Sequence, residues 1–211
     1  MQPQLYVCGS SADPLRIARS TNVTPVTPKR RRLIGLIFSA LLIAGLPACQ
    51  KTGGPQLPAG PYSVAEVFDG DSFNLQAKDG QIVRVRIAGI DAPEKTQPYS
   101  NKAKESLVDL LQSGPIGLQP VKVDAYDRWV ANVSIGDRDL GLAQIQRGYA
   151  WYFVRYKKDI SETQQQRYAE AERGARDARL GLWAGIEASV RNPALMPEPP
   201  WKFRERTRKE K

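Results

Sequence analysis

The stretch Gln81–Glu94, QIVRVRIAGIDAPE, decides the fold of this chain and also carries its first chemical signal. From 81 to 90 the residues alternate, with valine or isoleucine at 83, 85 and 87 and arginine at 84 and 86. A period of two is typical of a β-strand that has one face in the core and the other face turned away from it. The pattern therefore predicts a strand whose Arg86 side chain points away from the core.

Two more strands precede this stretch. Residues 64–68 and 72–77 are strand-like and are separated by the turn Asp69-Gly70. A second turn, Asp79-Gly80, connects them to the strand over 81–90, and Asp-Gly is a strong hairpin signal. The sequence therefore predicts three consecutive antiparallel strands.

The following residues predict helices and two further strands. We expect a helix over residues 100–111, followed by two strands over 116–124 and 129–135. Two further helices are expected over 140–147 and from about 161 onward. Ser100 is the expected cap of the first helix, and Ser161 with Gln164 forms a capping-box pattern at the last. We therefore predict a mainly β, α+β domain: a five-stranded OB-fold barrel with a helix between strands three and four and about three packed helices.

Composition indicates a globular protein whose basic charge lies at its two ends. The 211 residues are 41% apolar and 25% charged, as in ordinary globular domains. The formal charge is +9, but residues 1–49 carry +5 and residues 200–211 carry +4, which leaves 50–199 neutral. Any binding of a polyanion by the middle of the chain must therefore come from local placement of charge.

Residues 29–49 resemble an export signal. Lys29-Arg30-Arg31-Arg32 precedes an apolar run, Leu33–Leu46, that is too short to span a bilayer comfortably. The run ends in Leu46-Pro47-Ala48-Cys49, which resembles a bacterial lipoprotein box, although Pro47 departs from the usual residue. We therefore expect export to the cell envelope, with Cys49 as the candidate lipidation site. An uncleaved signal anchor and simple secretion are the alternatives.

The remaining boundaries follow from local composition. Residues 1–28 are polar and rich in Ser, Thr and Pro, which indicates an N-terminal extension or a start codon set too far upstream. The Gly/Pro-rich segment 50–60 predicts a flexible linker before a domain over 61–183. Residues 184–211 are Pro-rich and then basic, and we predict that they run extended over the surface.

A small set of carboxylates and arginines carries the chemistry. Asp71 follows the first predicted turn, Asp91 and Glu94 follow the strand that holds Arg86, and Arg128 lies in a later turn. Carboxylates can hold a hard cation and take a proton from water, while guanidiniums stabilise charge on a phosphate. The chain contains no histidine, so carboxylates must do any acid–base work near neutral pH. Together these residue types predict a metal-dependent phosphodiesterase, although each alone could belong to a turn, a cap or a solvated ion pair.

The order of several short motifs resembles the thermonuclease, or staphylococcal nuclease, family. They are Val67–Ser72, Val85–Glu94, Gln97-Pro98, Asp124–Arg128, Gly148–Trp151 and Gly181–Trp183. The resemblance covers about residues 62–183, and Pro200-Trp201 with Arg204 resembles the tail of bacterial members. It implies an OB-fold endonuclease that depends on Ca²⁺, acts on DNA and/or RNA with low sequence specificity and leaves 3′-phosphate ends.

The resemblance also implies a role for each matching residue. The carboxylates of Asp71 and Asp91 and the backbone carbonyl of Ala92 would be the calcium ligands, and all-oxygen ligation suits that ion. Glu94 would position or deprotonate the attacking water.

Substrate binding is implied by the same resemblance. Arg86 and Arg128 would bind the phosphate, for which bidentate guanidinium groups are well suited. Tyr126 would help to hold the substrate. We expect a monomer that contacts the membrane through a lipid anchor on Cys49 or through an uncleaved signal anchor.

One residue departs from the family pattern. Asp127 occupies the position of a glycine beside Arg128, where its carboxylate could compete for the guanidinium. We therefore expect reduced activity. The alternative function is a catalytically weak or inactive OB-fold module that binds nucleic acid or protein at the cell envelope.

Overall fold

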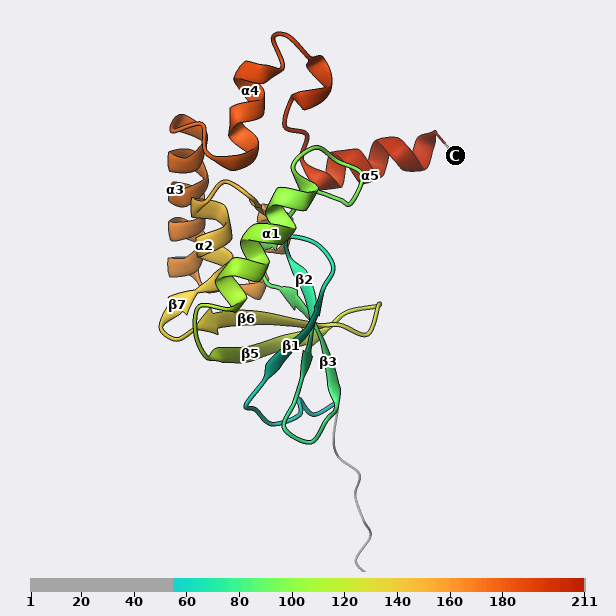
Figure 1. Ribbon diagram of the computed structural model, residues 1–211, viewed down its shortest axis with the longest axis vertical. Coiled ribbons are helices and arrows are strands. Elements are labelled where there is room, and N and C mark those ends of the chain that lie inside the picture. The colour runs from blue at the N-terminus through green and yellow to red at the C-terminus, as the bar shows by residue number, and fades with distance from the viewer. Residues whose placement is uncertain (1–54, 211) are drawn as a thin grey trace, which may run out of the picture. The chain divides into compact units, whose positions relative to one another are not determined.

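The computed structural model describes residues 55–210, whose centre is a five-stranded path in the order β1-β2-β3-β6-β5 (Figure 1). Its strands are β1 (Ser63–Val67), β2 (Ser72–Gln76), β3 (Ile82–Ile87), β5 (Ile116–Val123) and β6 (Trp129–Ile135), and the short β7 (Arg138–Asp139) pairs with β6. In Figure 1 the β1–β3 group crosses the β5–β6 pair, and the helices lie toward one end of the strands. This arrangement confirms the predicted OB-like α+β fold.

The strand β3 is the centre of the sheet, as its alternation predicts. Val83, Val85 and Ile87 are each 1% exposed and form part of the core, whereas Arg84 lies on the opposite, exposed face. β3 pairs antiparallel with β2 and parallel with β6. Parallel neighbours need a crossover connection, and the helix α1 (Ser100–Leu111) with β5 provides it.

The predicted strand over 81–90 is in fact two strands in different sheets. β3 ends at Ile87, the chain turns at Gly89 with φ +73°, and β4 (Ile90–Asp91) pairs with β8 (Trp151–Tyr152) instead. The prediction was wrong at this end because a residue in the left-handed region breaks the extended backbone, which glycine does readily. The turn brings Asp91 beside the end of the five-stranded sheet.

Three helices cover the core, as predicted. They are α1, α2 (Leu140–Gln146) and α3 (Glu162–Asp177). The capping box of Ser161 and Gln164 is present at α3. Ser100, however, is not a cap: the N-cap of α1 is Tyr99, with φ 66°, and the Ser100 hydroxyl donates a hydrogen bond to the carbonyl of Lys95 at 3.0 Å.

The predicted extended tail is largely helical. After the 3₁₀ segments η1 (Val154–Asp159) and η2 (Gly181–Ala184) come α4 (Gly185–Ala188), η3 (Pro193–Leu195) and α5 (Pro200–Lys209). The extended prediction rested on the prolines, but Pro200 stands at the first helical position, where its fixed φ suits a helix and its missing N–H costs nothing.

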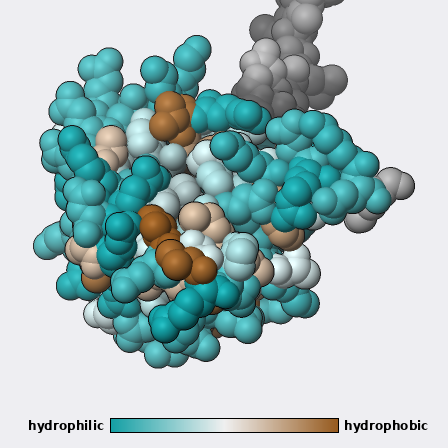
Figure 2. Space-filling view, turned by 90° about the horizontal axis from the view of Figure 1, so that it is seen from above, coloured by the Kyte–Doolittle hydropathy of each residue, from teal (hydrophilic) through white to brown (hydrophobic). Residues whose placement is uncertain are grey.

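The described part of the chain leaves the N-terminal predictions untested. The extension 1–28, the signal segment 29–49 and Cys49 lie outside the described residues, as do the first residues of the linker 50–60. Among residues 55–210, no helix is long and apolar enough to cross a membrane. Seen from the end that carries the helices, the surface is mostly hydrophilic, with small apolar areas near the middle of the view (Figure 2).

Candidate active site

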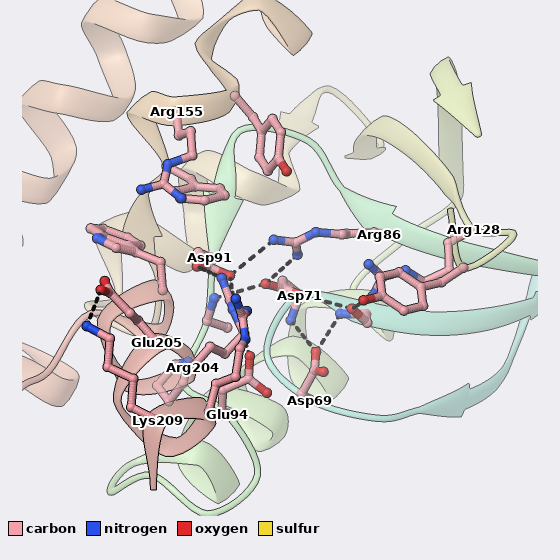
Figure 3. A pocket seen from close by; sticks show the side chains of 18 residues that line it. Asp69, Asp71, Arg86, Asp91, Glu94, Arg128, Arg155, Arg204, Glu205 and Lys209 are labelled. Atoms are coloured by element: carbon pink, nitrogen blue, oxygen red, sulfur yellow. Dashed lines mark hydrogen bonds and ion pairs between the residues drawn. The ribbon is translucent and has the colours of Figure 1, made fainter. Parts of the chain in front are cut away.

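A cavity of about 750 Å³ opens beside the ends of the strands, and α5 forms one of its walls (Figure 3). Its lining is dominated by charged and aromatic side chains: Asp69, Asp71, Asp91, Glu94, Glu205, Arg86, Arg128, Arg155, Arg204, Arg208, Lys209, Tyr126, Phe153, Tyr156 and Trp201. Ser72, Ala92 and Pro93 complete it. All seven residues to which the sequence assigns metal or substrate roles line this one cavity.

The turn between β1 and β2 places Asp71 at the cavity. The Asp69 carboxylate accepts the backbone N–H groups of Asp71 and Ser72 at 2.9 and 2.7 Å, which fixes the turn. Gly70 between them is tightly packed, because a Cβ there would lie 2.7 Å from the Cβ atoms of Ala92 and Ala103. Burial and the negative charge of Asp71 raise the pKa of Asp69 to about 7.

The buried side-chain amide of Gln144 also stabilises this turn. Gln144 on α2 is fully buried, and its side-chain N–H₂ group donates to the carbonyls of Gly70 at 2.8 Å and Ala103 at 3.0 Å. The Ser106 hydroxyl in turn donates to the Gln144 carbonyl at 2.6 Å. Sequence reasoning missed Gln144, because a single polar residue on an apolar helix face does not indicate which groups its side chain will bind.

Asp71 and Asp91 meet inside the protein, 5% and 1% exposed, with Arg86 between them. Arg86 Nη1 lies 2.7 Å from Asp71 Oδ2, and its Nη2 lies 3.1 Å from Asp91 Oδ1. The N–H of Ala92 also donates to Asp71 Oδ2, at 2.9 Å, and the Ser72 hydroxyl donates to Asp71 Oδ1 at 2.7 Å. The guanidinium therefore offsets the repulsion of two buried carboxylates.

The two carboxylates differ in their pKa. Burial acts to raise the pKa of Asp71, but the charge of Arg86 and the donated hydrogen bonds outweigh it and lower the pKa below its ordinary value. Burial and the charge of Asp71 raise the pKa of Asp91, against the opposing pull of Arg204 and Arg86. Asp71 is thus the more firmly ionised member of the pair.

Glu94 lies at the mouth of the cavity, four residues after the start of β4. Its backbone N–H donates to the Gln97 side chain at 2.9 Å, and Gln97 itself is buried. Its carboxylate forms an ion pair with Arg204 of α5 at 2.5 Å. The half-buried Glu94 carboxylate therefore faces the cavity with a cation as its neighbour (Figure 3).

Arg128 and Tyr126 come from the turn between β5 and β6. Arg128 Nε and Nη2 both contact Asp124 Oδ2, at 2.9 and 2.7 Å, and its Nη1 approaches the Ser72 hydroxyl at 3.3 Å. Tyr126 is 72% exposed, and its ring centre lies 5.4 Å from the Arg128 guanidinium. Asp127 is exposed with φ +60°, so this position requires the left-handed backbone that glycine adopts most easily.

The donor set at Asp71 and Asp91 fits a hard divalent cation. Among residues 55–210, no ready-made cluster of three or more acidic, histidine or cysteine ligands exists, because arginines occupy the space between the carboxylates. The available donors are carboxylate and backbone oxygens, which suit Ca²⁺ or Mg²⁺ rather than a soft metal. Arg86 and Arg204 already neutralise these two carboxylates, so a cation that binds them has to displace a guanidinium.

Sequence reasoning named Arg204 only as part of a tail motif and gave it no role at the site. Its Nη2 lies 2.8 Å from Asp91 Oδ2, and its Nη1 contacts Glu94. The signal available was its spacing from Trp201, which places both on one helix face three residues apart. That spacing becomes informative only once α5 is known to be a helix.

Comparisons with known proteins show that the chain is similar to nucleases. Residues 84–185 match the model of the family described as "Staphylococcal nuclease homologue". The chain is 31% identical to the Micrococcal nuclease of Shigella flexneri over 175 residues, which are 79% of this chain and 88% of that protein.

Two other relatives match over the central domain. The "Uncharacterized endonuclease" of Haemophilus influenzae is 32% identical over 57% of this chain and 65% of its own length. The Staphylococcal-like nuclease CAN1 of Arabidopsis thaliana is 29% identical over 65% of this chain and 38% of its own length. The chain thus spans less than two thirds of the length of these two relatives.

Proposed function

Because the chain belongs to the staphylococcal nuclease family, we propose that it is a calcium-dependent nuclease that hydrolyses phosphodiester bonds of DNA and/or RNA with low sequence specificity. One observation carries the proposal: the three carboxylates and two arginines predicted from the sequence come from separate segments and line a single cavity. The names of the relatives, which are nucleases, support the substrate class.

The cation would be held by the Asp71 and Asp91 carboxylates and the backbone carbonyl of Ala92. When bound, it supplies positive charge that stabilises the extra negative charge on the pentacoordinate phosphorus. Arg86 and Arg128 bind non-bridging phosphate oxygens, as planar guanidiniums do well.

Glu94 acts as the base in this proposal. It takes a proton from a water molecule whose oxygen forms a bond to phosphorus, while the bond to the 5′-oxygen breaks and that oxygen takes up a proton. The products carry a 3′-phosphate and a 5′-hydroxyl. Tyr126, exposed at the rim, contacts the substrate without reading a base edge, which is consistent with low sequence specificity.

The decisive experiment measures cleavage of single-stranded DNA and RNA by the full chain. Calcium should support cleavage and EGTA should abolish it. Glu94→Gln should lower kcat by a factor on the order of 10²–10⁴, because the amide cannot accept the proton. Glu105→Gln, on the exposed face of α1 and outside the cavity, is the matched control and should behave as wild type. Equal rates for Glu94→Gln and wild type would contradict the proposal.

A second candidate is a binding module without turnover. The observation that favours it is the double contact of Arg128 with Asp124, which occupies two of the guanidinium nitrogens. Retention of nucleic acid in EGTA without any cleavage in calcium would support this candidate.

We also propose export to the cell envelope through residues 29–49, with a lipid on Cys49. Mass spectrometry of the mature protein should show a lipidated Cys49 at its N-terminus, and Cys49→Ser should release the protein from the membrane fraction. An unmodified mature protein in the medium would indicate simple secretion.

A further inference from the structure

The helix α5 delivers a third arginine to the candidate active site. Arg204 contacts Asp91 and Glu94 across 113 and 110 residues of chain, so only the tertiary fold brings these groups together. Figure 3 shows its guanidinium between the two carboxylates, on the side away from Arg128.

The position of α5 does not depend on Arg204 alone. The Trp201 ring stacks on Phe153 with centres 5.1 Å apart and an interplanar angle of 21°. The Gln97 side chain donates to the carbonyl of Glu198 at 2.9 Å, and Pro200 is buried. Gln97 also accepts the N–H of Glu94, so one side chain ties the loop of Glu94 to the start of α5. These contacts hold Arg204 over the cavity.

The two arginines on Asp91 are held very differently. The Arg86 side chain is 14% exposed, lies in the central strand and has Asp71 and the Ile90 carbonyl as further partners. The Arg204 side chain is 38% exposed and comes from a helix with a largely exposed surface. A cation that needs oxygens of Asp91 therefore displaces Arg204 at lower cost than Arg86.

The displaced guanidinium has a new partner close by. A water molecule activated by Glu94 lies within hydrogen-bond distance of that carboxylate, and the phosphorus it attacks lies about 3–3.5 Å further on. Arg204 Nη1 already lies 2.5 Å from Glu94 Oε1. The phosphate oxygens of a bound substrate are thus within reach of Arg204 after a change of side-chain rotamer.

We propose that Arg204 is a third phosphate-binding arginine, which leaves Asp91 for the phosphodiester when cation and substrate bind. The inference rests on the proposed nuclease function. In the described state Arg204 neutralises Asp91 and Glu94, and in the loaded state it stabilises charge on phosphorus, so its positive charge is used in both.

Activity of two variants on the same helix tests the proposal. Arg204→Gln should lower kcat/KM by about 10- to 100-fold, mainly through kcat, since the contact strengthens in the transition state. Arg206→Gln is the matched control: Arg206 pairs with Glu198 and Glu210, does not line the cavity, and should leave kcat within about twofold. Added methylguanidinium should partly restore Arg204→Ala, which a purely structural role of Arg204 would not allow.

Binding measurements test the exchange without any turnover. By calorimetry, Arg204→Gln should bind Ca²⁺ several-fold more tightly than wild type, because no guanidinium has to leave Asp91. In the presence of Ca²⁺ it should bind a nucleoside 3′,5′-bisphosphate, which has phosphate groups but no diester bond, several-fold more weakly. Unchanged or weaker Ca²⁺ binding would overturn the exchange, and unchanged bisphosphate binding would overturn the phosphate contact.

The outcomes separate this inference from the proposed function. If wild type cleaves nucleic acid and Arg204→Gln cleaves it equally well or faster, Arg204 is not a phosphate ligand although the protein is a nuclease. If wild type does not cleave at all, the proposed function fails, while both binding measurements still test Arg204.

Discussion

Asp124 holds the backbone and the side chain of Arg128 at once. One oxygen of the Asp124 carboxylate accepts hydrogen bonds from the backbone N–H groups of Tyr126 and Arg128 at 2.9 and 3.0 Å. The other oxygen accepts hydrogen bonds from two nitrogens of the Arg128 guanidinium. The hydrogen bonds and charge of Arg128 outweigh partial burial and lower the pKa of Asp124. The group that competes with substrate for Arg128 is therefore Asp124, and the Asp127 side chain is exposed beside it.

Asp127→Gly tests how much the departure from the family matters. Glycine relieves the left-handed backbone at φ +60°, although it also gains entropy in the unfolded chain. We expect the free energy of unfolding to rise by less than about 1 kcal/mol. Because Arg128 stays paired with Asp124, the gain in kcat/KM on single-stranded DNA should be small. Urea unfolding and steady-state kinetics measure both, and a tenfold gain in kcat/KM would show that Asp127 does compete for Arg128.

Asp69 predicts a pH dependence of stability in the absence of calcium. Its pKa rises to about 7 in the folded protein and is near 4 in the unfolded chain, so the folded state binds more protons between these values. Stability should therefore fall as pH rises from 5 to 7, by up to about 2 kcal/mol. Asp69→Asn keeps an oxygen that can accept the two N–H groups and should flatten this slope. Urea unfolding in EDTA at several pH values measures how the free energy of unfolding changes with pH. An equal change in wild type and Asp69→Asn would contradict the assignment to Asp69.

At the residue scale, the sequence predicts the members of the site better than their partners. Alternation alone indicates that Arg86 leaves the core face, and family motifs indicate Asp71, Asp91 and Glu94. Neither could show that Arg86 bridges two carboxylates, because that depends on where the chain turns after β3. The tail motif names Arg204 but could not show its partners, since these are more than a hundred residues away.

At the scale of elements, the turn at Gly89 separates the main sheet from the β4–β8 pair and so positions Asp91. A Cβ at this residue would lie 2.9 Å from two side-chain atoms of Ile160, in addition to the cost of φ +73°. Gly89→Ala should therefore lower the free energy of unfolding by about 2–4 kcal/mol and reduce activity by shifting Asp91.

A second glycine provides the control for this prediction. Gly80 has φ +84°, but a Cβ there would meet nothing within 4 Å. Gly80→Ala should cost only the backbone strain, about 1–2 kcal/mol, and leave activity unchanged. Equal losses of stability in urea for the two variants would show that the contact with Ile160 is unimportant.

The Gln144 amide joins α1, α2 and the β1–β2 turn. Gln144→Leu would remove the amide that donates to the buried carbonyls of Gly70 and Ala103, so we expect a loss of about 2–4 kcal/mol. Ser106→Ala removes only the hydroxyl that donates to the amide and should cost about 1–2 kcal/mol. The difference is measurable by urea unfolding. Because Gly70 precedes Asp71, Gln144→Leu should also weaken calcium binding, and a variant with unchanged stability and affinity would argue against the network.

Periodicity and turn residues predict the elements well where the sequence is regular. The meander, α1 to α3 and the β5–β6 pair all follow from local patterns. The tail could not be predicted in this way, because α5 is a polar helix whose docking depends on contacts with distant segments made by Trp201, Pro200, Arg204 and the Glu198 carbonyl.

At the scale of the whole molecule, the net positive charge lies at the two ends of the chain. Residues 50–199 are neutral overall, so we expect the affinity for phosphate to come mainly from local placement of arginines at the cavity, including Arg204 of the basic segment 200–211. If Arg86, Arg128 and Arg204 each neutralise one phosphate of single-stranded DNA, log KM should rise with log salt with a slope of about 2. A slope of 4 or more would show that basic residues other than Arg86, Arg128 and Arg204 also bind the substrate.

The place of α5 in the chain sets the order in which the molecule is completed. Synthesis runs from the N-terminus, so the residues that carry Asp71, Asp91 and Glu94 emerge well before Arg204. Closing a contact over 113 residues also carries a larger loop entropy than forming the meander, so α5 docks late. Until α5 has docked, Asp91 and Glu94 lack their ion pairs with Arg204. Neutralisation of these two carboxylates by Arg204 is therefore among the last steps in the folding of the chain.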